Sequence, residues 1–281
     1  MTVTLTHPWA TFYRSNWRSD VRRLDPVENL TIGAHSDDGE ILDPLGVVKS
    51  FKGHERLGVV IVNNGAGRPR AAPYEELSEE AMTRLRMQEQ IAAARYGRYE
   101  FAVGLAHPSS CMQGKRNDAV VNELREILSA TKPRRLVTHN PFDCHPSHIA
   151  VLEHVFWALE ELRPTYQPEE IFGGEVWGGI DRVPEPYLVR WDCSELQNVQ
   201  EDVLEYFTSQ NAIKKYHIAV MARRRALAKL NDPHVTLEAT AVHLAVDLRS
   251  VLQGETTLRN LVARCYEQMQ SAQLNLYASR A

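Results

Sequence analysis

Apolar runs of strand length alternate with segments of helical period along most of the chain. The clearest runs are Leu30–Ala34, Leu57–Asn63, Tyr99–Ala106 and Arg135–His139. This order is typical of repeated βα units, in which each helix covers the strand before it. The pattern predicts an α/β, Rossmann-like fold: a mostly parallel β-sheet flanked by helices, with a helical C-terminal elaboration.

Capping residues and helix breakers set the expected helix ends. Ser78 is placed to cap a helix that runs to about Tyr96. Between the first two strands we expect either one helix from about Glu40 to Lys52, or a turn and a shorter helix if Pro44 breaks it. Ser194 and Gln197 have the spacing of a capping box, and a helical pattern follows them.

The chain length of 281 residues fits one large domain with an elaboration, because single α/β domains often reach ~250 residues. We divide it into an N-terminal arm at 1–26, a Rossmann-like catalytic core at 27–193, and a mainly helical part of the same domain at 194–281. The arm contains four aromatic residues, which favour packing on the body over a flexible lead: Trp9, Phe12, Tyr13 and Trp17.

Charge and composition exclude several classes of protein. With 32 basic and 36 acidic residues, the chain has no electrostatic reason to bind nucleic acid. No apolar run is long enough for a membrane span, and arginines interrupt the N-terminal segment where a signal peptide would need an apolar core. A cytoplasmic location is expected. The basic run Arg223–Arg225 is interpreted as a solvated helix face.

Two polar clusters follow predicted strands, at the edge where parallel sheets bind their ligands. The first runs from Ala34 to Glu40 and the second from His139 to His148. Each has a purely structural alternative, because Asp37 and Asp38 can cap a helix and His148 lies on an apolar helix face.

Taken together, the clusters offer two histidines and a carboxylate from separate loops, which is the open three-ligand set of a catalytic zinc site. Asp37 and His145 then remain for acid–base chemistry. The same donors also accept Fe²⁺ or Co²⁺, so Zn²⁺ is our choice among several metals.

The first cluster, Ala-His-Ser-Asp-Asp-Gly-Glu, resembles the A-H-P-D-D-x-E signature of the PIG-L (LmbE-like) metal-dependent N-acetylglucosaminyl de-N-acetylases. The second is similar to the family's D-x-H-P-D-H signature, and the resemblance covers about residues 28–155. It implies that His35, Asp38 and His148 are the metal ligands. It also implies that Asp37 is the general base and that His145 stabilises the oxyanion or protonates the leaving amine.

Three positions depart from the family pattern. Ser36 stands in place of the usual proline, and Ser147 in place of the aspartate between the two histidines. Residues 42–45 replace a glycine pair, which puts the shape of the adjacent substrate wall in question.

Five further residues are candidates for substrate binding or for supporting the metal ligands. Arg86 either positions substrate or forms an ion pair with Glu89 on the same helix, and Arg68 either meets an anionic or sugar substrate or lies in a solvated loop. Asp143 and His139 can accept hydrogen bonds from metal-bound histidines. Trp177 either walls the sugar pocket or packs on the sheet.

We therefore expect a zinc-dependent de-N-acetylase that removes acetate from a small N-acetylglucosamine-type substrate, an amino sugar or its conjugate. Two alternatives stay open: an amidase acting on a thiol- or sugar-conjugate amide, and a non-catalytic Rossmann-like protein that binds a sugar or nucleotide. The sequence leaves the substrate undetermined, and a homo-oligomer is compatible with it.

Overall fold

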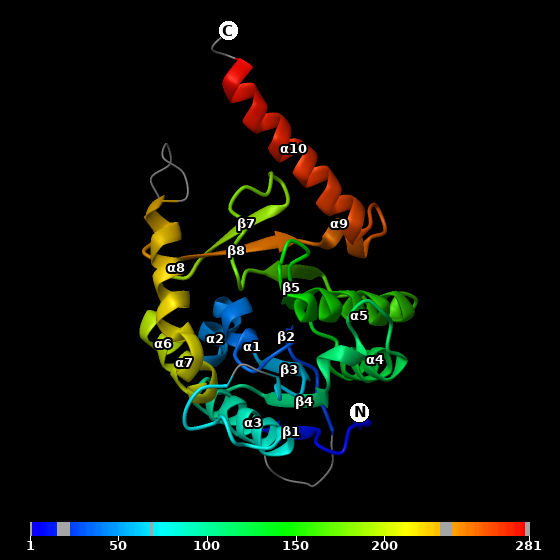
Figure 1. The fold of residues 1–281 in the computed structure, drawn as a ribbon. Helices are drawn as coiled ribbons and strands as arrows, with labels where there is room; N and C mark the ends of the chain where they lie inside the picture. The colour runs from blue at the N-terminus through cyan, green and yellow to red at the C-terminus, as the bar shows by residue number, and fades with distance from the viewer. Residues whose placement is uncertain (1, 16–22, 68–69, 231–237, 279–281) are drawn as a thin grey trace.

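The structure, a computed structural model, describes residues 2–15, 23–67, 70–230 and 238–278 (Figure 1). Its strands form one eight-stranded sheet in the order β1-β4-β3-β2-β5-β6-β8-β7. The strands are β1 (Thr11–Arg14), β2 (Asn29–Gly33), β3 (Leu57–Asn63), β4 (Phe101–His107), β5 (Arg135–His139), β6 (Glu170–Gly174), β7 (Leu188–Asp192) and β8 (Val242–Asp247).

Helices follow most of the strands. They are α1 (Asp38–Leu42), α2 (Pro44–Phe51), α3 (Glu79–Tyr96), α4 (Asp118–Thr131), α5 (Pro146–Leu162), α6 (Gln197–Glu205), α7 (Thr208–Lys214), α8 (Tyr216–Leu230), α9 (Arg249–Leu252) and α10 (Leu258–Ala278), with a 3₁₀ turn at Ser109–Cys111. None of the helices in the described ranges is both long and apolar enough to cross a bilayer.

The five central strands, β4, β3, β2, β5 and β6, are parallel. Strands β1 and β8 run antiparallel to them, and β7 pairs antiparallel with β8. This confirms the predicted α/β class. The chain order reverses between β2 and β5, the two strands that the polar clusters follow. In open α/β sheets such a reversal opens a crevice at the carboxyl ends of the strands, where ligands bind.

Alternating residues of β3 face two different helical layers. Val60 and Val62 pack in the core formed with α4 and α5, whereas Val59 and Ile61 pack with α1, α2 and α6. The strand is buried on both faces, which explains why its sequence is an unbroken apolar run.

Local signals locate several helix ends well. The Ser78 hydroxyl accepts a hydrogen bond from Ala81 N at 3.1 Å and begins α3 where predicted. Pro44 does break the first helical segment, into α1 and α2. Asp43, in the stretch that departs from the family pattern, caps α2 by accepting from Gly46 N at 2.8 Å and pairs with Arg135 at 2.8 Å.

The C-terminal part differs from the sequence prediction in three ways. The Ser194–Gln197 capping box is wrong, because Leu196 is the N-cap of α6 and no side chain caps it. Strand β8, which the helical pattern concealed, lies between β6 and β7. The basic run is a solvated face only in part: Arg225 is exposed, whereas Arg224 is only 1% exposed and donates to the carbonyl oxygens of Glu40 and Ile41 at 3.1 and 3.0 Å.

The described part of the N-terminal arm packs on the body, as its aromatic residues suggested. Strand β1 pairs with the sheet edge at β4, and the Thr6 hydroxyl donates to Glu123 at 2.7 Å. At the other end of the chain, α10 projects away from the sheet (Figure 1).

Candidate active site

The loop after β2 places Asp37 in a strained conformation. Asp37 has φ = 86°, in the left-handed region, and stands at the N-cap of α1 without a side-chain capping bond. Its carboxylate instead accepts a hydrogen bond from Gln210 Nε2 at 3.1 Å. The capping alternative therefore does not describe Asp37, and strained residues of this kind cluster at functional sites.

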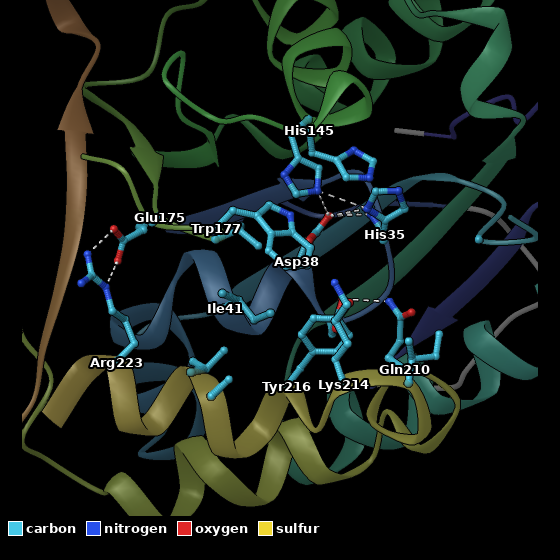
Figure 2. Close-up of a pocket in the computed structure, with 18 of the residues that line it drawn as sticks. His35, Asp38, Ile41, His145, Glu175, Trp177, Gln210, Lys214, Tyr216 and Arg223 are labelled. Atoms are coloured by element: carbon cyan, nitrogen blue, oxygen red, sulfur yellow. Dashed lines mark hydrogen bonds and ion pairs between the residues drawn. The ribbon is translucent and has the colours of Figure 1, made fainter. Parts of the chain in front are cut away.

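Three donor atoms from the two polar clusters converge (Figure 2). His35 Nδ1 lies 3.4 Å from Asp38 Oδ2 and 3.3 Å from His148 Nε2, and the last two atoms are 3.7 Å apart. Ligands held ~2 Å from a tetrahedral zinc ion stand roughly 3.3 Å from one another. The spacing and chemistry of this donor set therefore fit a zinc ion.

Asp143 orients the ring of His148. His148 Nδ1 lies 3.0 Å from Asp143 Oδ2, which leaves Nε2 as the nitrogen that faces His35 and Asp38. Asp143 is itself held, because its other oxygen accepts from His145 N at 2.8 Å. A carboxylate behind a histidine is the usual arrangement for a metal ligand.

His139 packs against the three converging donors. Two overlapping groups of potential ligands exist besides the set above, His35–His145–His148 and Asp38–His139–His148. However, His139 Nε2 accepts a hydrogen bond from Ala34 N at 2.9 Å, so its lone pair is already used. The ring stacks on His148 with 3.9 Å between centroids and supports it from below.

His145 presents a hydrogen-bond donor to the cavity. Its Nδ1 accepts from Ser147 N at 3.2 Å at the start of α5. A nitrogen that accepts a backbone N–H carries no proton, so the neutral ring holds its proton on Nε2. Burial and the neighbouring His35 lower the pKa of His145, which favours that neutral form.

The pKa values of the adjacent Asp37 and Asp38 carboxyl groups shift in opposite directions. Burial, followed by the neighbouring Asp38, raises the pKa of Asp37 well above its ordinary value. Burial acts in the same sense on Asp38, but His148 and His139 outweigh it and hold the pKa of Asp38 well below the usual range. Burial and His139 lower the pKa of His148 to about 4, so its imidazole is neutral, as a metal ligand must be.

Arg86 and Glu89 do not form the ion pair that their spacing allowed: within the described ranges no contact of 4.0 Å or less joins their charged groups. Arg86 lines the cavity and donates to Gly65 O. Glu89 accepts from Ser209 N at 2.8 Å and from the Ser209 and Thr208 hydroxyls at 2.7 Å each. Glu89 therefore holds the start of α7, and Arg86 is left facing the cavity.

Trp177 lines the cavity and is 41% exposed, so it is not packed away against the sheet. Its ring meets Tyr216 edge-on at 5.8 Å, and the Lys214 ammonium lies 5.1 Å from the ring centroid. Both neighbours also line the cavity (Figure 2). Arg68 lies outside the described residues.

The two serines that depart from the family pattern have local partners. The Ser36 hydroxyl donates to Arg86 O at 3.3 Å, and the Ser147 hydroxyl accepts from Gln113 Nε2 at 3.0 Å. Ser36 thus ties the loop after β2 to α3. Neither substitution removes a member of the donor set.

Sequence reasoning assigned no role to several residues of the site. Gln210 donates to Ser36 O at 2.7 Å as well as to Asp37, and Asn63 lines the cavity with both amide atoms lacking a partner among the described residues. Asn63 is the last residue of β3, so the rule that ligands gather at strand ends was the signal for it. Gln210 comes from α7, far along the chain from the two polar clusters.

Comparisons with known proteins agree with this geometry. The family model described as PIG-L, GlcNAc-PI de-N-acetylase, matches residues 30–159. No curated protein sequence matches significantly.

Solved structures share the fold at low sequence identity. A conserved protein, TT1542, from Thermus thermophilus is 18% identical, with a TM-score of 0.59 over 79% of this chain and 94% of its own. The 4-carboxy-2-hydroxymuconate hydratase GalB from Pseudomonas putida is 15% identical, with a TM-score of 0.62 over 79% and 96%. N,N'-diacetylchitobiose deacetylase from Pyrococcus horikoshii is 15% identical, with a TM-score of 0.56 over 78% and 84%.

At these identities the structural likenesses establish the fold, and they include both a deacetylase and a hydratase. The family match is more informative about the site than the structural likenesses, because it spans both polar clusters and every residue of the converging donor set. Residues 30–159, slightly under half of the chain, match the PIG-L family model.

Proposed function

We propose that the protein is a metal-dependent de-N-acetylase that removes acetate from an N-acetylglucosamine-type substrate, an amino sugar or its conjugate. The observation that carries this proposal is the pairing of one open donor set with two uncommitted acid–base groups at the same cavity. His35, Asp38 and His148 would hold the metal, and Zn²⁺ suits their nitrogen and oxygen donors. Bound zinc would polarise a carbonyl and lower the pKa of water.

The chain's own residues have distinct tasks in this reaction. Asp37, held by Gln210, accepts a proton from the attacking water, and Asp37 or His145 then delivers a proton to the amine nitrogen as the C–N bond breaks. His145 donates from Nε2 to the oxygen on which charge develops, a contribution often worth ~3 to 4 kcal/mol for one donor. Arg86, at the cavity wall without a carboxylate partner within 4.0 Å among the described residues, positions the sugar.

Release of acetate tests the proposal directly. We would incubate the purified protein with N-acetylglucosamine, N,N'-diacetylchitobiose and N-acetylglucosamine conjugates, and measure acetate and free amine with and without a chelator. We expect equal amounts of the two products and loss of activity with the chelator. Turnover that survives complete metal removal would contradict the metal dependence.

Asp37→Ala separates an enzyme from a protein that only binds. This variant should retain bound metal, because Asp37 is not among the three donors, and should lose deacetylation. Hydrolysis at the wild-type rate would show that Asp37 is not the base. A wild-type protein that binds these sugars without releasing acetate would instead support the non-catalytic alternative, and release of other acyl groups would support the amidase.

A further inference from the structure

The cavity extends well beyond the metal-binding end. Its volume is about 690 Å³, within the range of ~300–1,000 Å³ that holds drug-sized ligands. It reaches from His35 past Trp177 to Glu175 and Arg223, which lie at the opposite end in Figure 2. A substrate that occupies this length needs a part that extends away from the reacting amide.

The cavity is also bordered by aliphatic side chains from four parts of the fold. We call these residues the aliphatic wall: Ile41 of α1, Val176 after β6, Ile213 of α7, and Ala219 and Val220 of α8. Figure 2 shows Ile41 between the histidines and α8. None of these side chains can donate or accept a hydrogen bond.

The charged side chains at the far end of the cavity form ion pairs with one another. The Arg223 guanidinium contacts Glu175 Oε1 at 2.9 Å and both Asp181 oxygens at 2.7 Å. Glu175 is only 3% exposed, and its second oxygen accepts from Arg223 Nε at 3.1 Å. Both carboxyl groups at this end therefore have a cationic partner within the protein.

A second hollow continues from the same point. It shares Gly179, Asp181 and Arg223 with the first cavity, and its other neighbours are mainly apolar: Ala226, Leu227, Leu230 and Met269. Apolar surface thus resumes beyond the ion pairs.

The wall is suited to hydrocarbon and poorly suited to a second sugar. A hydroxyl group that is buried without a hydrogen-bond partner costs about 1–3 kcal/mol, and a sugar ring laid on this wall would bring several. An alkyl or aryl group loses nothing there and is stabilised by its removal from water.

We infer that the cavity binds an amino sugar carrying an apolar substituent, an alkyl or aryl aglycone that lies along the aliphatic wall while the amide is held at the metal-binding end. This inference rests on the proposed function and names its substrate class. The aglycone contacts α7 and α8, which lie outside the segment matched to the family.

Chain length in a series of glycosides measures the contribution of the wall. We would compare methyl, butyl and hexyl N-acetylglucosaminides below their micelle concentrations and determine kcat/KM for each. We expect kcat/KM to rise by up to about fourfold for each methylene that becomes buried, mainly through KM. Equal kcat/KM across the series would overturn the inference, as would a preference for diacetylchitobiose over the hexyl glycoside.

Two substitutions on α8 provide a matched pair. Val220→Asn alters the wall, whereas Ile218→Asn alters a side chain that is 56% exposed and does not line the cavity. The hexyl-to-methyl ratio of kcat/KM should fall toward one in the Val220 variant and stay at the wild-type value in the Ile218 variant. The same fall in both would show that the wall is not the cause.

A binding measurement distinguishes failure of this inference from failure of the proposed function. Calorimetric titration with methyl and hexyl glucoside, which carry no amide, reports the apolar contact without turnover. Tighter binding of hexyl glucoside to wild type, reduced by Val220→Asn, supports the inference even if no N-acetyl sugar is hydrolysed. Equal binding of the two glucosides refutes it, whatever the enzymatic activity.

Discussion

The two halves of the cavity lining come from parts of the chain with different architecture. The proposed metal-binding end is built by the loops after β2 and β5, within the parallel sheet and within the family-matched segment. The aliphatic wall and the far end come largely from α7, α8 and the loop after β6, outside that segment. The first region carries the groups for chemistry and the second surrounds them.

The proposed metal-binding end can be recognised from short sequence motifs, whereas the aliphatic wall cannot. Residues 35–40 are contiguous, so a single loop brings His35, Asp37 and Asp38 to one place. The wall combines residues separated by more than 170 positions, such as Ile41 and Val220. The comparison predicts that substitutions at the proposed metal-binding end reduce activity on every substrate. Substitutions in the second region should change which substrates are preferred and how well the first region is supported.

The largest effect is expected from His148→Ala, which removes one of the three donors. The protein should lose stoichiometric metal and all measurable deacetylation, because two remaining donors no longer form a three-ligand set. Elemental analysis of the purified variant checks this. Wild-type metal content in His148→Ala would refute the ligand assignment.

His154→Ala is the control, because His154 is a second buried imidazole of α5. Its Nδ1 lies 2.7 Å from Ala150 O and its Nε2 accepts from Asn117 N at 3.0 Å, so it serves packing and not the cavity. It should keep its metal even if its stability falls. Parallel loss of metal in both variants would indicate damage to α5 and not removal of a ligand.

Arg224→Met should give the next largest effect, on stability. Besides the Glu40 and Ile41 carbonyl groups, its guanidinium donates to Gln200 Oε1 at 3.1 Å. Methionine would leave these buried acceptors unpaired at the end of α1, for a loss of roughly 3 kcal/mol in the free energy of unfolding. Urea titration measures it.

The neighbouring Arg225→Met is the matched control for this stability loss. Arg225 is exposed and pairs with Glu201 at 3.2 Å, so its loss should cost under ~1 kcal/mol. Equal losses in the two variants would mean that α8 does not support α1 through Arg224.

Arg224 and Arg225 also show what sequence patterns can and cannot predict. Strands β3 and β5 and the start of α3 follow from local apolar runs and a capping serine, and their predicted bounds agree with the structure. Three consecutive arginines look like a solvated face because charge is usually solvated. Only the tertiary fold brings Arg224 to the unpaired carbonyl groups of a helix more than 180 residues away.

Some parts of the candidate site could likewise be predicted from the sequence, and others could not. The positions of the first and second polar clusters follow from the rule on strand ends, and the structure brings them together. The rule could not assign His139, since its role depends on the hydrogen bond from Ala34 N. Strand β8 was concealed because its short apolar run stands between helical segments and pairs only with distant strands.

The smallest effect is expected from Gln210→Ala, which tests whether the second region positions the proposed base. The side chain is 8% exposed and joins α7 to Ser36 O and to Asp37. Its loss frees the Asp37 carboxylate to leave the productive orientation, so kcat should fall about 10-fold with little change in KM or metal content. Steady-state kinetics on the methyl glycoside, with metal analysis, measure this.

Gln197→Ala is the matched control for that loss of kcat. Gln197 is a half-buried glutamine at the start of α6, and it bonds to Thr240 at 2.8 Å, away from the cavity. It should leave kcat unchanged. If Gln210→Ala also left kcat unchanged, the C-terminal helices would select the substrate without positioning the base; if it instead raised KM alone, Gln210 would belong with the substrate-binding wall.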